Sequence, residues 1–352
     1  MAAVGGDNFM RYIYRGEEGE IIPREATHIT VAEDCTVVRA FAFYEHPNIV
    51  EIICHEKVER IGQRAFRCCP SLRRVVMPGV TFADERAFCE CHVLTDVECG
   101  KLERMRGCAF DDCESLRSIN LPSARTVSEH VFCNCTALVD VKFGSKLERL
   151  EDGIFVNCPS FERITIPLKD CIIYDDSFQD CGNLKHVDLV EGAELREIIA
   201  ALLLEDWRND MNEEIDSINH ILPNARAGYW ADNFEGDDGE KAQVIRTWIR
   251  SVLRKIIHYQ AEHQHVLNVA TTTLKLALPH DIVNRSILPF LELPSHTFEL
   301  AEGGDEDDDE VSYSEGSSSE EEESSEEGES GMEEESSNDD EVPSKRQRIQ
   351  DR

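Results

Sequence analysis

The chain has 352 residues, with 71 acidic against 36 basic side chains and a formal net charge of −35. This excess of acid does not suit binding to nucleic-acid phosphates or to anionic membrane surfaces, because such surfaces are bound through Lys and Arg. The longest apolar run, residues 198–204, falls far short of the roughly 20 residues of a membrane-spanning helix. The N-terminal segment lacks the apolar core of a secretory signal, so we expect an intracellular protein of the cytoplasm or nucleus.

An internal repeat occupies the first half of the chain. A phenylalanine, often preceded by alanine, recurs every 22 or 23 residues, at Phe43, Phe66, Phe88, Phe110, Phe132, Phe155 and Phe178. Three residues after each one stands a second fixed position, held by His46, Cys69, Cys91, Cys113, Cys135, Cys158 and Cys181. A third fixed position, usually Leu, follows after three more residues, and a fourth, Val or Ile, after another three. Four positions that keep register over seven units define a structural repeat.

Each unit predicts one short strand, as in LRRVVMP, LTDVECG and LRSINLP, which Pro or Gly usually closes. One such unit cannot bury its apolar side alone, whereas stacked units share a continuous core. The period lies in the range of leucine-rich repeats. We therefore predict an α+β protein: an N-terminal cap region at 1–27, a leucine-rich-repeat solenoid of about seven repeats with parallel β-strands at 28–192, a helical region at 193–300 and a disordered acidic tail at 301–352.

The repeat resembles the BspA-like subclass of leucine-rich repeats, whose core reads I-x-x-x-A-F-x-x-C-x-x-L. The segments IGQRAFRCCPSL (61–72) and MRGCAFDDCESL (105–116) carry the resemblance. It covers about residues 28–190, and it implies a curved parallel solenoid used for protein contacts. Some members are surface adhesins, and others are intracellular proteins of microbial eukaryotes; the sequence favours the second group.

Six of the fourteen cysteines occupy the second fixed position of the repeat. Zinc sites normally pair two Cys-x2–4-Cys motifs, a spacing that this chain lacks. Equivalent cysteines of adjacent coils would lie about 5 Å apart, inside the disulfide range, but their parallel Cβ directions suit an S–S bond poorly. We predict a ladder of buried free thiols that pack as small apolar side chains, with a redox role as the open alternative.

The second half predicts helices. Apolar residues at three- and four-residue steps predict one helix over 194–222, directly after the last repeat, where it would cap the open end of the solenoid. A connector at 222–240 precedes a long helix over 240–276, which Pro279 ends.

The long helix carries a basic side, for which we weigh solvation against binding to an acidic partner or to the acidic tail: Arg246, Arg250, Arg254 and Lys255. A short helix is expected at 281–293. Its surroundings, LPHDIVNRSILPFLELP (278–294), resemble the opening of an F-box, which implies a ubiquitin-ligase substrate receptor as a minor alternative.

The tail is rich in Asp, Glu, Ser and Gly, a composition that cannot bury enough apolar surface to fold. An acid stands three residues after each of eight candidate phosphorylation sites for an acidophilic kinase: Ser312, Ser317, Ser318, Ser319, Ser324, Ser330, Ser336 and Ser337. We interpret Lys345, Arg346 and Arg348 as a short basic import signal. These features favour, as the main alternative function, a nuclear protein whose acidic tail binds basic proteins such as histones.

Familiar catalytic and nucleotide-binding motifs are absent from the sequence, and His258, His263 and His265 do not share one helix face as metal ligands would. We therefore expect no enzyme, no cofactor, no metal and no nucleic-acid or membrane partner. The main hypothesis is a monomeric protein-binding scaffold. Strand alternation predicts its concave-face residues as Arg74, Val76, Asp96, Glu98, Ser118, Asn120, Asp140, Lys142, Arg163, Thr165, His186 and Asp188.

Overall fold

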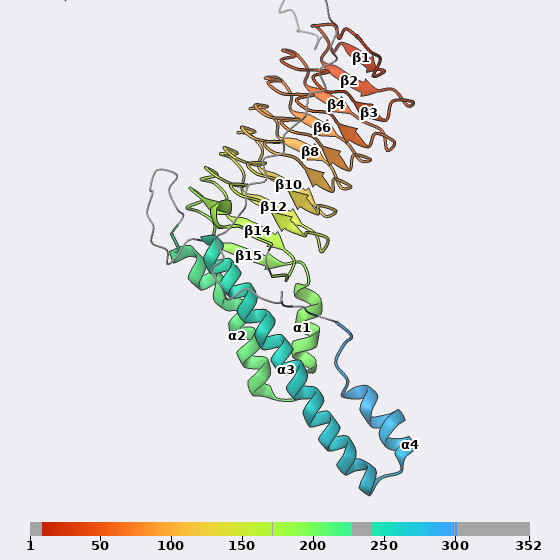
Figure 1. Cartoon of the computed structure of the whole chain (residues 1–352), viewed down its shortest axis with the longest axis vertical. Coiled ribbons are helices and arrows are strands. Elements are labelled where there is room, and N and C mark those ends of the chain that lie inside the picture. Colours follow the sequence, from red (N-terminus) through yellow and green to blue (C-terminus); the bar gives the residue numbers. More distant parts are fainter. Residues whose placement is uncertain (1–8, 171, 227–240, 297, 299, 301–352) are drawn as a thin grey trace, which may run out of the picture. The chain divides into compact units, whose positions relative to one another are not determined.

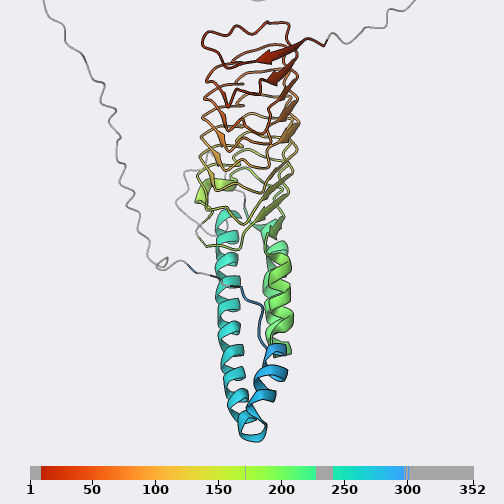
Figure 2. The same ribbon diagram turned by 90° about the vertical axis from the view of Figure 1, so that its right-hand side faces the viewer.

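The computed structural model describes residues 9–170, 172–226, 241–296, 298 and 300. The chain divides into the compact unit Met1–Gly303 and a second unit, Gly304–Arg352, which lies outside the described residues. Within the first unit, stacked coils with parallel strands are followed by helices (Figures 1 and 2). The predicted fold class, a parallel leucine-rich-repeat solenoid followed by helices, is confirmed.

Two sheets run along the stack, one on each of two sides of the coils. The first sheet has two pieces, with strand orders β1-β2-β4-β6-β8 and β10-β12-β14-β15. Its strands are β1 Arg11–Tyr14, β2 His28–Val31, β4 Glu51–Ile53, β6 Arg74–Val76, β8 Asp96–Glu98, β10 Ser118–Leu121, β12 Asp140–Phe143, β14 Arg163–Ile166 and β15 His186–Leu189. The second sheet is continuous and consists of β3 Val37–Val38, β5 Arg60–Ile61, β7 Phe82–Ala83, β9 Arg104–Met105, β11 Thr126–Val127 and β13 Arg149–Leu150.

The register of the strands equals the period of the sequence. Val75 pairs with Ile52 on one side and with Val97 on the other, so equivalent residues of the repeat stack directly above one another. Alternation along each strand buries one side chain and turns its neighbours outward, as in β10, where Ile119 and Leu121 are buried. Each coil thus adds one layer to a shared apolar core, which no single coil could form.

The third side of each coil carries the repeated phenylalanine, and its backbone enters the left-handed region of positive φ. The residues two before and two after it adopt positive φ; around Phe66 these are Arg64 at 53° and Cys68 at 57°. The N–H groups of Arg64, Phe66 and Cys68 then all point to the next coil and donate to the carbonyls of residues 85, 87 and 89 at 2.8–2.9 Å. Each non-glycine residue in this conformation costs about 1–2 kcal/mol, a cost that the directed inter-coil hydrogen bonds offset.

The phenylalanine rings form one stack through the core. Ring centroids from Phe43 to Phe66 and onward are 4.8, 5.2, 5.1, 5.7 and 5.7 Å apart as far as Phe155, with interplanar angles of at most 15°. Tyr14 begins the stack at 5.0 Å from Phe43, and Phe178 ends it at 5.6 Å from Phe155. Because each of these phenylalanines is at most 2% exposed, each contributes the full burial of an aromatic side chain to the stability of the stack.

The cysteine ladder is buried, as predicted, and it makes hydrogen bonds that the sequence did not reveal. Each thiol donates to the carbonyl of the phenylalanine one coil earlier; Cys91 Sγ lies 3.1 Å from Phe66 O and Cys113 Sγ lies 3.3 Å from Phe88 O. Burial raises the pKa of Cys69 to about 12 and those of Cys91 and Cys113 well above the ordinary value. The thiols therefore stay protonated and remain donors, and all cysteines of the described residues are free.

The helix expected over 194–222 is two helices, so that prediction was wrong at one point. Here α1 Gly192–Ala201 and α2 Glu205–Ile221 are separated by an extended backbone at Leu202 and Leu204. Arg208 Nη1 donates to the carbonyls of Leu202 and Leu203 and thereby satisfies the broken end of α1. Apolar spacing continues unbroken across this point and could not show the turn, because the same three- and four-residue steps serve both helices.

The long helix α3, Lys241–Ala277, packs on α2 and on the 3₁₀ turn η1, Asp175–Phe178, of the last coil. At its start the buried Lys241 Nζ donates to Leu184 O at 2.8 Å and to Leu222 O at 2.9 Å, and burial lowers the pKa of this lysine. The 3₁₀ turn η2, Leu222–Asn224, ends α2. The remaining elements are α4 His280–Ile282, η3 Val283–Ile287 and η4 Leu288–Phe290. Of these helices, α2 contacts β15 and α3 contacts η1, at the end of the repeat stack where the sequence predicts a cap.

We predict that Cys113→Ala lowers the free energy of unfolding by about 1–2 kcal/mol, because it removes a buried sulfur and its bond to Phe88 O. Chemical denaturation of the purified protein measures this change. The matched control is Cys133→Ala, which removes a half-buried thiol outside the ladder and is expected to cost less than about 0.5 kcal/mol. Equal effects of the two variants would show that the ladder position has no special role in stability.

Candidate protein-binding face

The outward side chains of the first sheet form the candidate site, which we call the broad face. Outward and buried positions alternate, since Val75, Ile119, Val141, Ile164 and Val187 are all at most 3% exposed. The twelve predicted residues all lie outward on neighbouring strands. Five of them are exposed: Asp96, Glu98, Ser118, Asn120 and Lys142. The other seven are half-buried: Arg74, Val76, Asp140, Arg163, Thr165, His186 and Asp188. Their role in binding a partner stays a prediction.

Arg74 is the centre of a charged cluster on the first piece of the sheet. Its Nε donates to Asp96 and its Nη1 to Glu51, both at 2.9 Å, and its Nη2 donates to Glu98. Each nitrogen of the guanidinium thus has its own carboxylate. With three carboxylates around one cation, the cluster is negative, and its net charge repels a phosphate.

An apolar row lies beside this cluster and was missed by the sequence analysis. It consists of Ile13, Ile53 and Val76 with Thr30 between them, paired in register across β1, β2, β4 and β6. Ile13 is 52% exposed and Ile53 is 38% exposed. The signal was present, because Glu51 and Ile53 precede Arg74 and Val76 by one period of 23 residues.

On the second piece of the sheet, the charges are paired with one another. Lys142 Nζ lies 3.3 Å from Asp140, and Arg163 Nη1 lies 2.6 Å from Asp188. Asp140 Oδ1 is buried and has no hydrogen-bond partner among the described residues. Strand pairing is interrupted between β8 and β10, while β9 and β11 of the second sheet stay paired. The interruption therefore affects only one side of the coil.

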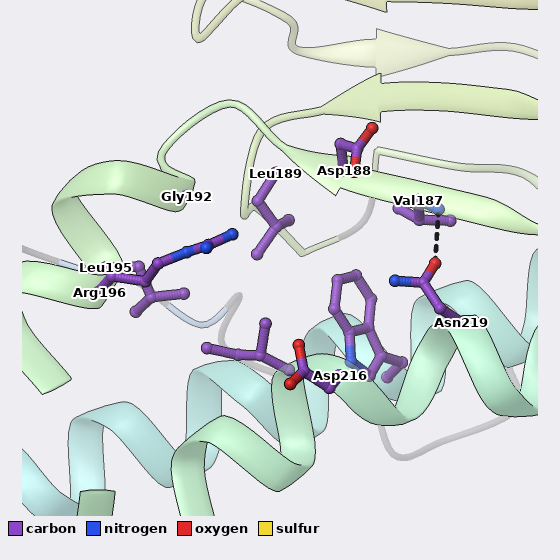
Figure 3. Close-up of a pocket in the computed structure, with 10 residues that line it drawn as sticks. Val187, Asp188, Leu189, Gly192, Leu195, Arg196, Asp216 and Asn219 are labelled. Carbon is purple, nitrogen blue, oxygen red and sulfur yellow. Dashed lines mark hydrogen bonds between the residues drawn. The ribbon is translucent and has the colours of Figure 1, made fainter.

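A small pocket of about 110 Å³ closes the end of the broad face, between β15, α1, α2 and α3 (Figure 3). Leu189, Leu195, Ile215 and Trp248 give it apolar walls. Asn219 Oδ1 accepts from Val187 N at 3.3 Å, and this bond joins α2 to the last strand (Figure 3). Polar groups at the rim are Asp188, Arg196, Asp216 and Asn219. The pocket has the size of one aliphatic side chain.

The basic side expected on α3 is used inside the molecule. Arg250 Nε donates to Asp170 at 2.9 Å, and Lys255 Nζ lies 3.0 Å from Asp210 and 2.8 Å from Glu214. Arg246 donates to Ile173 O at 3.4 Å and to Gln243 at 2.7 Å, and Arg254 also interacts within the molecule. Arg254 is exposed and the other three are half-buried, and binding of this side to an acidic partner or to the acidic tail stays a prediction.

A group of thiols and carboxylates lies beside the phenylalanines on the third side of the coils. Cys68 Sγ donates to Glu90 at 3.0 Å, and Asn134 Nδ2 donates to Asp111 at 3.4 Å. Burial and the neighbouring Asp112 raise the pKa of Asp111 to about 6. Within the described ranges, no group of three or more His, Cys, Asp or Glu side chains is arranged to hold a metal ion.

Other predicted sites are placed apart from the broad face or outside the described residues. The segment 278–294 contains the short irregular helix formed by α4, η3 and η4. His263 of α3 lies with its Nε2 2.8 Å from the carbonyl oxygen of Leu291, and this hydrogen bond joins the segment to α3. The eight candidate phosphoserines and Lys345, Arg346 and Arg348 lie outside the described residues. None of the described helices is long and apolar enough to cross a bilayer.

The sequence matches the family model of the BspA type leucine rich repeat region over residues 24–127 and 103–200, with six copies. Together these segments span half of the chain, and the protein belongs to this leucine-rich-repeat family, as its sequence resemblance predicted. Proteins with this repeat are in general interaction scaffolds without enzymatic activity. No curated protein matches the chain.

Several solved structures are similar to the repeats. The *Treponema pallidum* leucine rich repeat protein is 21% identical over 47% of this chain and 70% of its own, with a TM-score of 0.35. A *Bacteroides ovatus* leucine-rich repeat protein is 20% identical over 48% and 62%, with a TM-score of 0.22. A leucine rich cell surface protein of *Faecalibacterium prausnitzii* is 15% identical over 51% and 83%, with a TM-score of 0.22. Nothing about partners or location follows from these similarities.

We predict that Asp111→Asn raises the melting temperature, and more so at about pH 7.5 than at about pH 5. The pKa of Asp111 is raised to about 6 in the folded chain, so between about pH 4 and pH 6 the folded chain keeps a proton that the unfolded chain has lost. The contribution of Asp111 to the free energy of unfolding therefore falls as pH rises through this range. Asparagine does not titrate, so the variant does not lose stability in this way as pH rises. Thermal unfolding at both pH values measures it, with the exposed Glu129→Gln as the control for one lost charge. A gain from Asp111→Asn that is the same at both pH values would contradict the assignment.

Proposed function

We propose that the protein is an intracellular, non-enzymatic scaffold that binds a protein partner across the broad face. The observation that carries this proposal is the apolar row of Ile13, Ile53 and Val76, left uncovered on rigid, hydrogen-bonded strands. Exposed apolar side chains that lie side by side, bordered by polar residues, are typical of protein-binding surfaces.

The charges beside the row favour a protein over a nucleic acid as the partner. Arg74 and Arg163 are both paired with carboxylates, so neither offers an uncompensated positive charge to phosphates. Asp96 and Glu98 keep more than half of their side chains exposed, which suits a partner that brings Lys or Arg beside its apolar contacts. The pocket at the far end of the face is suited to one aliphatic anchor residue of the same partner.

The sequence also raised two other functions, and they depend on different parts of the chain. Binding of histones or other basic proteins would depend on residues 301–352, and a ubiquitin-ligase role would depend on residues 278–294. Deletion of each segment therefore separates these functions from binding at the broad face.

We predict that Ile53→Lys abolishes binding of the specific partners of the protein, because it places a charged ammonium in the apolar row. Quantitative mass spectrometry of proteins that co-purify with the tagged full chain, expressed in its native cells, measures this loss. The matched control is Val266→Lys on α3, since Val266 is 37% exposed and Ile53 is 38% exposed.

Partners that vanish with Ile53→Lys and persist with Val266→Lys and with the 301–352 deletion would support the proposal. Partners that persist with Ile53→Lys but vanish when 301–352 or 278–294 is deleted would refute it, and the deletion responsible would identify the alternative. Thermal unfolding of both lysine variants verifies that each is folded.

A further inference from the structure

A second surface, separate from the broad face, lies on the second sheet. The outward residues of β5, β7 and β9 are Arg60, Phe82 and Arg104, paired in register on three neighbouring strands. Arg106 follows Arg104 by two residues and so turns to the same side. We call these three arginines with Phe82 and Asp84 the Phe82 arginine cluster.

The cluster is held by the sheet and by its own contacts. The guanidinium carbons of Arg60 and Arg106 lie over the Phe82 ring, at 4.6 and 5.7 Å from its centroid. Asp84, whose side chain is 10% exposed, forms an ion pair with Arg60 and lies 3.6 Å from Arg106. Arg60 and Arg106 are therefore positioned before any partner arrives, which reduces the entropy that binding costs.

The cluster carries more positive charge than its own carboxylate neutralises. Arg60 and Arg106 share the carboxylate of Asp84, and Arg104 has no ion pair with any described residue. Apart from Arg60 Nη2, none of their nitrogens donates a hydrogen bond to a described residue. The side chains of Arg60 and Arg106 are 48% and 64% exposed. Arg74 on the broad face is the opposite case, because all of its nitrogens are used.

The geometry points to an acidic peptide segment as the occupant, and we propose that the Phe82 arginine cluster is a binding site for such a segment of a protein partner. Arg60 and Arg104 stand two strands apart, about 10 Å at the usual strand spacing, a separation that two acidic side chains of one extended peptide can match. Guanidinium forks match planar carboxylates, and the half-buried Phe82 ring offers a flat apolar surface between them.

Fluorescence anisotropy with a labelled peptide of about ten glutamates, titrated with the full chain at low salt, tests the proposal. We expect saturable binding that Arg104→Gln weakens about tenfold, equivalent to about 1.4 kcal/mol, and that Arg106→Gln weakens similarly. The matched control is Arg149→Gln on β13. This exposed arginine lies in the same row of the same sheet and outside the cluster, and Glu151 neutralises its charge, so we expect its loss to change binding less than about twofold.

Absence of saturable binding by the wild-type chain would overturn the proposal. Equal weakening by Arg104→Gln and Arg149→Gln would also overturn it, because it would show an effect of net charge alone. A labelled oligothymidine of the same length that binds as tightly as the peptide would replace the acidic peptide with a polyphosphate partner. Binding at this cluster is independent of the broad face, so Ile53→Lys should leave peptide binding unchanged.

Discussion

Hydrogen bonding between successive coils is the constraint on which the rest of the structure depends. On the third side, N–H groups at alternate residues must meet carbonyls of the next coil, which requires positive φ at two positions of each repeat. That requirement fixes the spacing of the coils, and the spacing places phenylalanine over phenylalanine at 4.8–5.7 Å. The cysteine thiol completes the arrangement, because it bonds a carbonyl of the preceding coil without adding the bulk of a larger polar group.

A stack built in this way has two open ends, and the chain covers each end differently. At the N-terminal end, His46 takes the place of cysteine, and its Nε2 lies 3.0 Å from Pro23 O, the equivalent of the thiol bond. Burial lowers the pKa of His46, which favours the neutral ring that donates through Nε2. At the C-terminal end, Lys241 bonds carbonyls of Leu184 and Leu222, and Arg250 pairs with Asp170 of the last coil. Arg250, one of the four basic residues on this side of α3, thus contacts the last coil.

The sequence predicted the repeated features and missed those that occur once. Seven copies of one repeat predict the phenylalanine and cysteine positions, the strand register and the outward residues from Arg74 to Asp188. The break between α1 and α2 depends on Arg208 reaching two carbonyls, a contact that no local pattern encodes. The pocket and the Phe82 arginine cluster depend on side chains from several coils or helices, so only the folded chain brings them together. The apolar row could have been found, because Ile53 keeps the register of Val76.

The proposed function requires that a partner cover the broad face at the apolar row. Site-specific photo-crosslinking tests it most directly: a benzophenone amino acid replaces Ile53 in one chain and Val266 in another, and both are irradiated in native cells. The account predicts a discrete covalent adduct from position 53 that is absent at position 266, although both positions are almost equally exposed. An adduct of the same protein at position 266 with none at position 53 would contradict it and would move the binding surface to the helices.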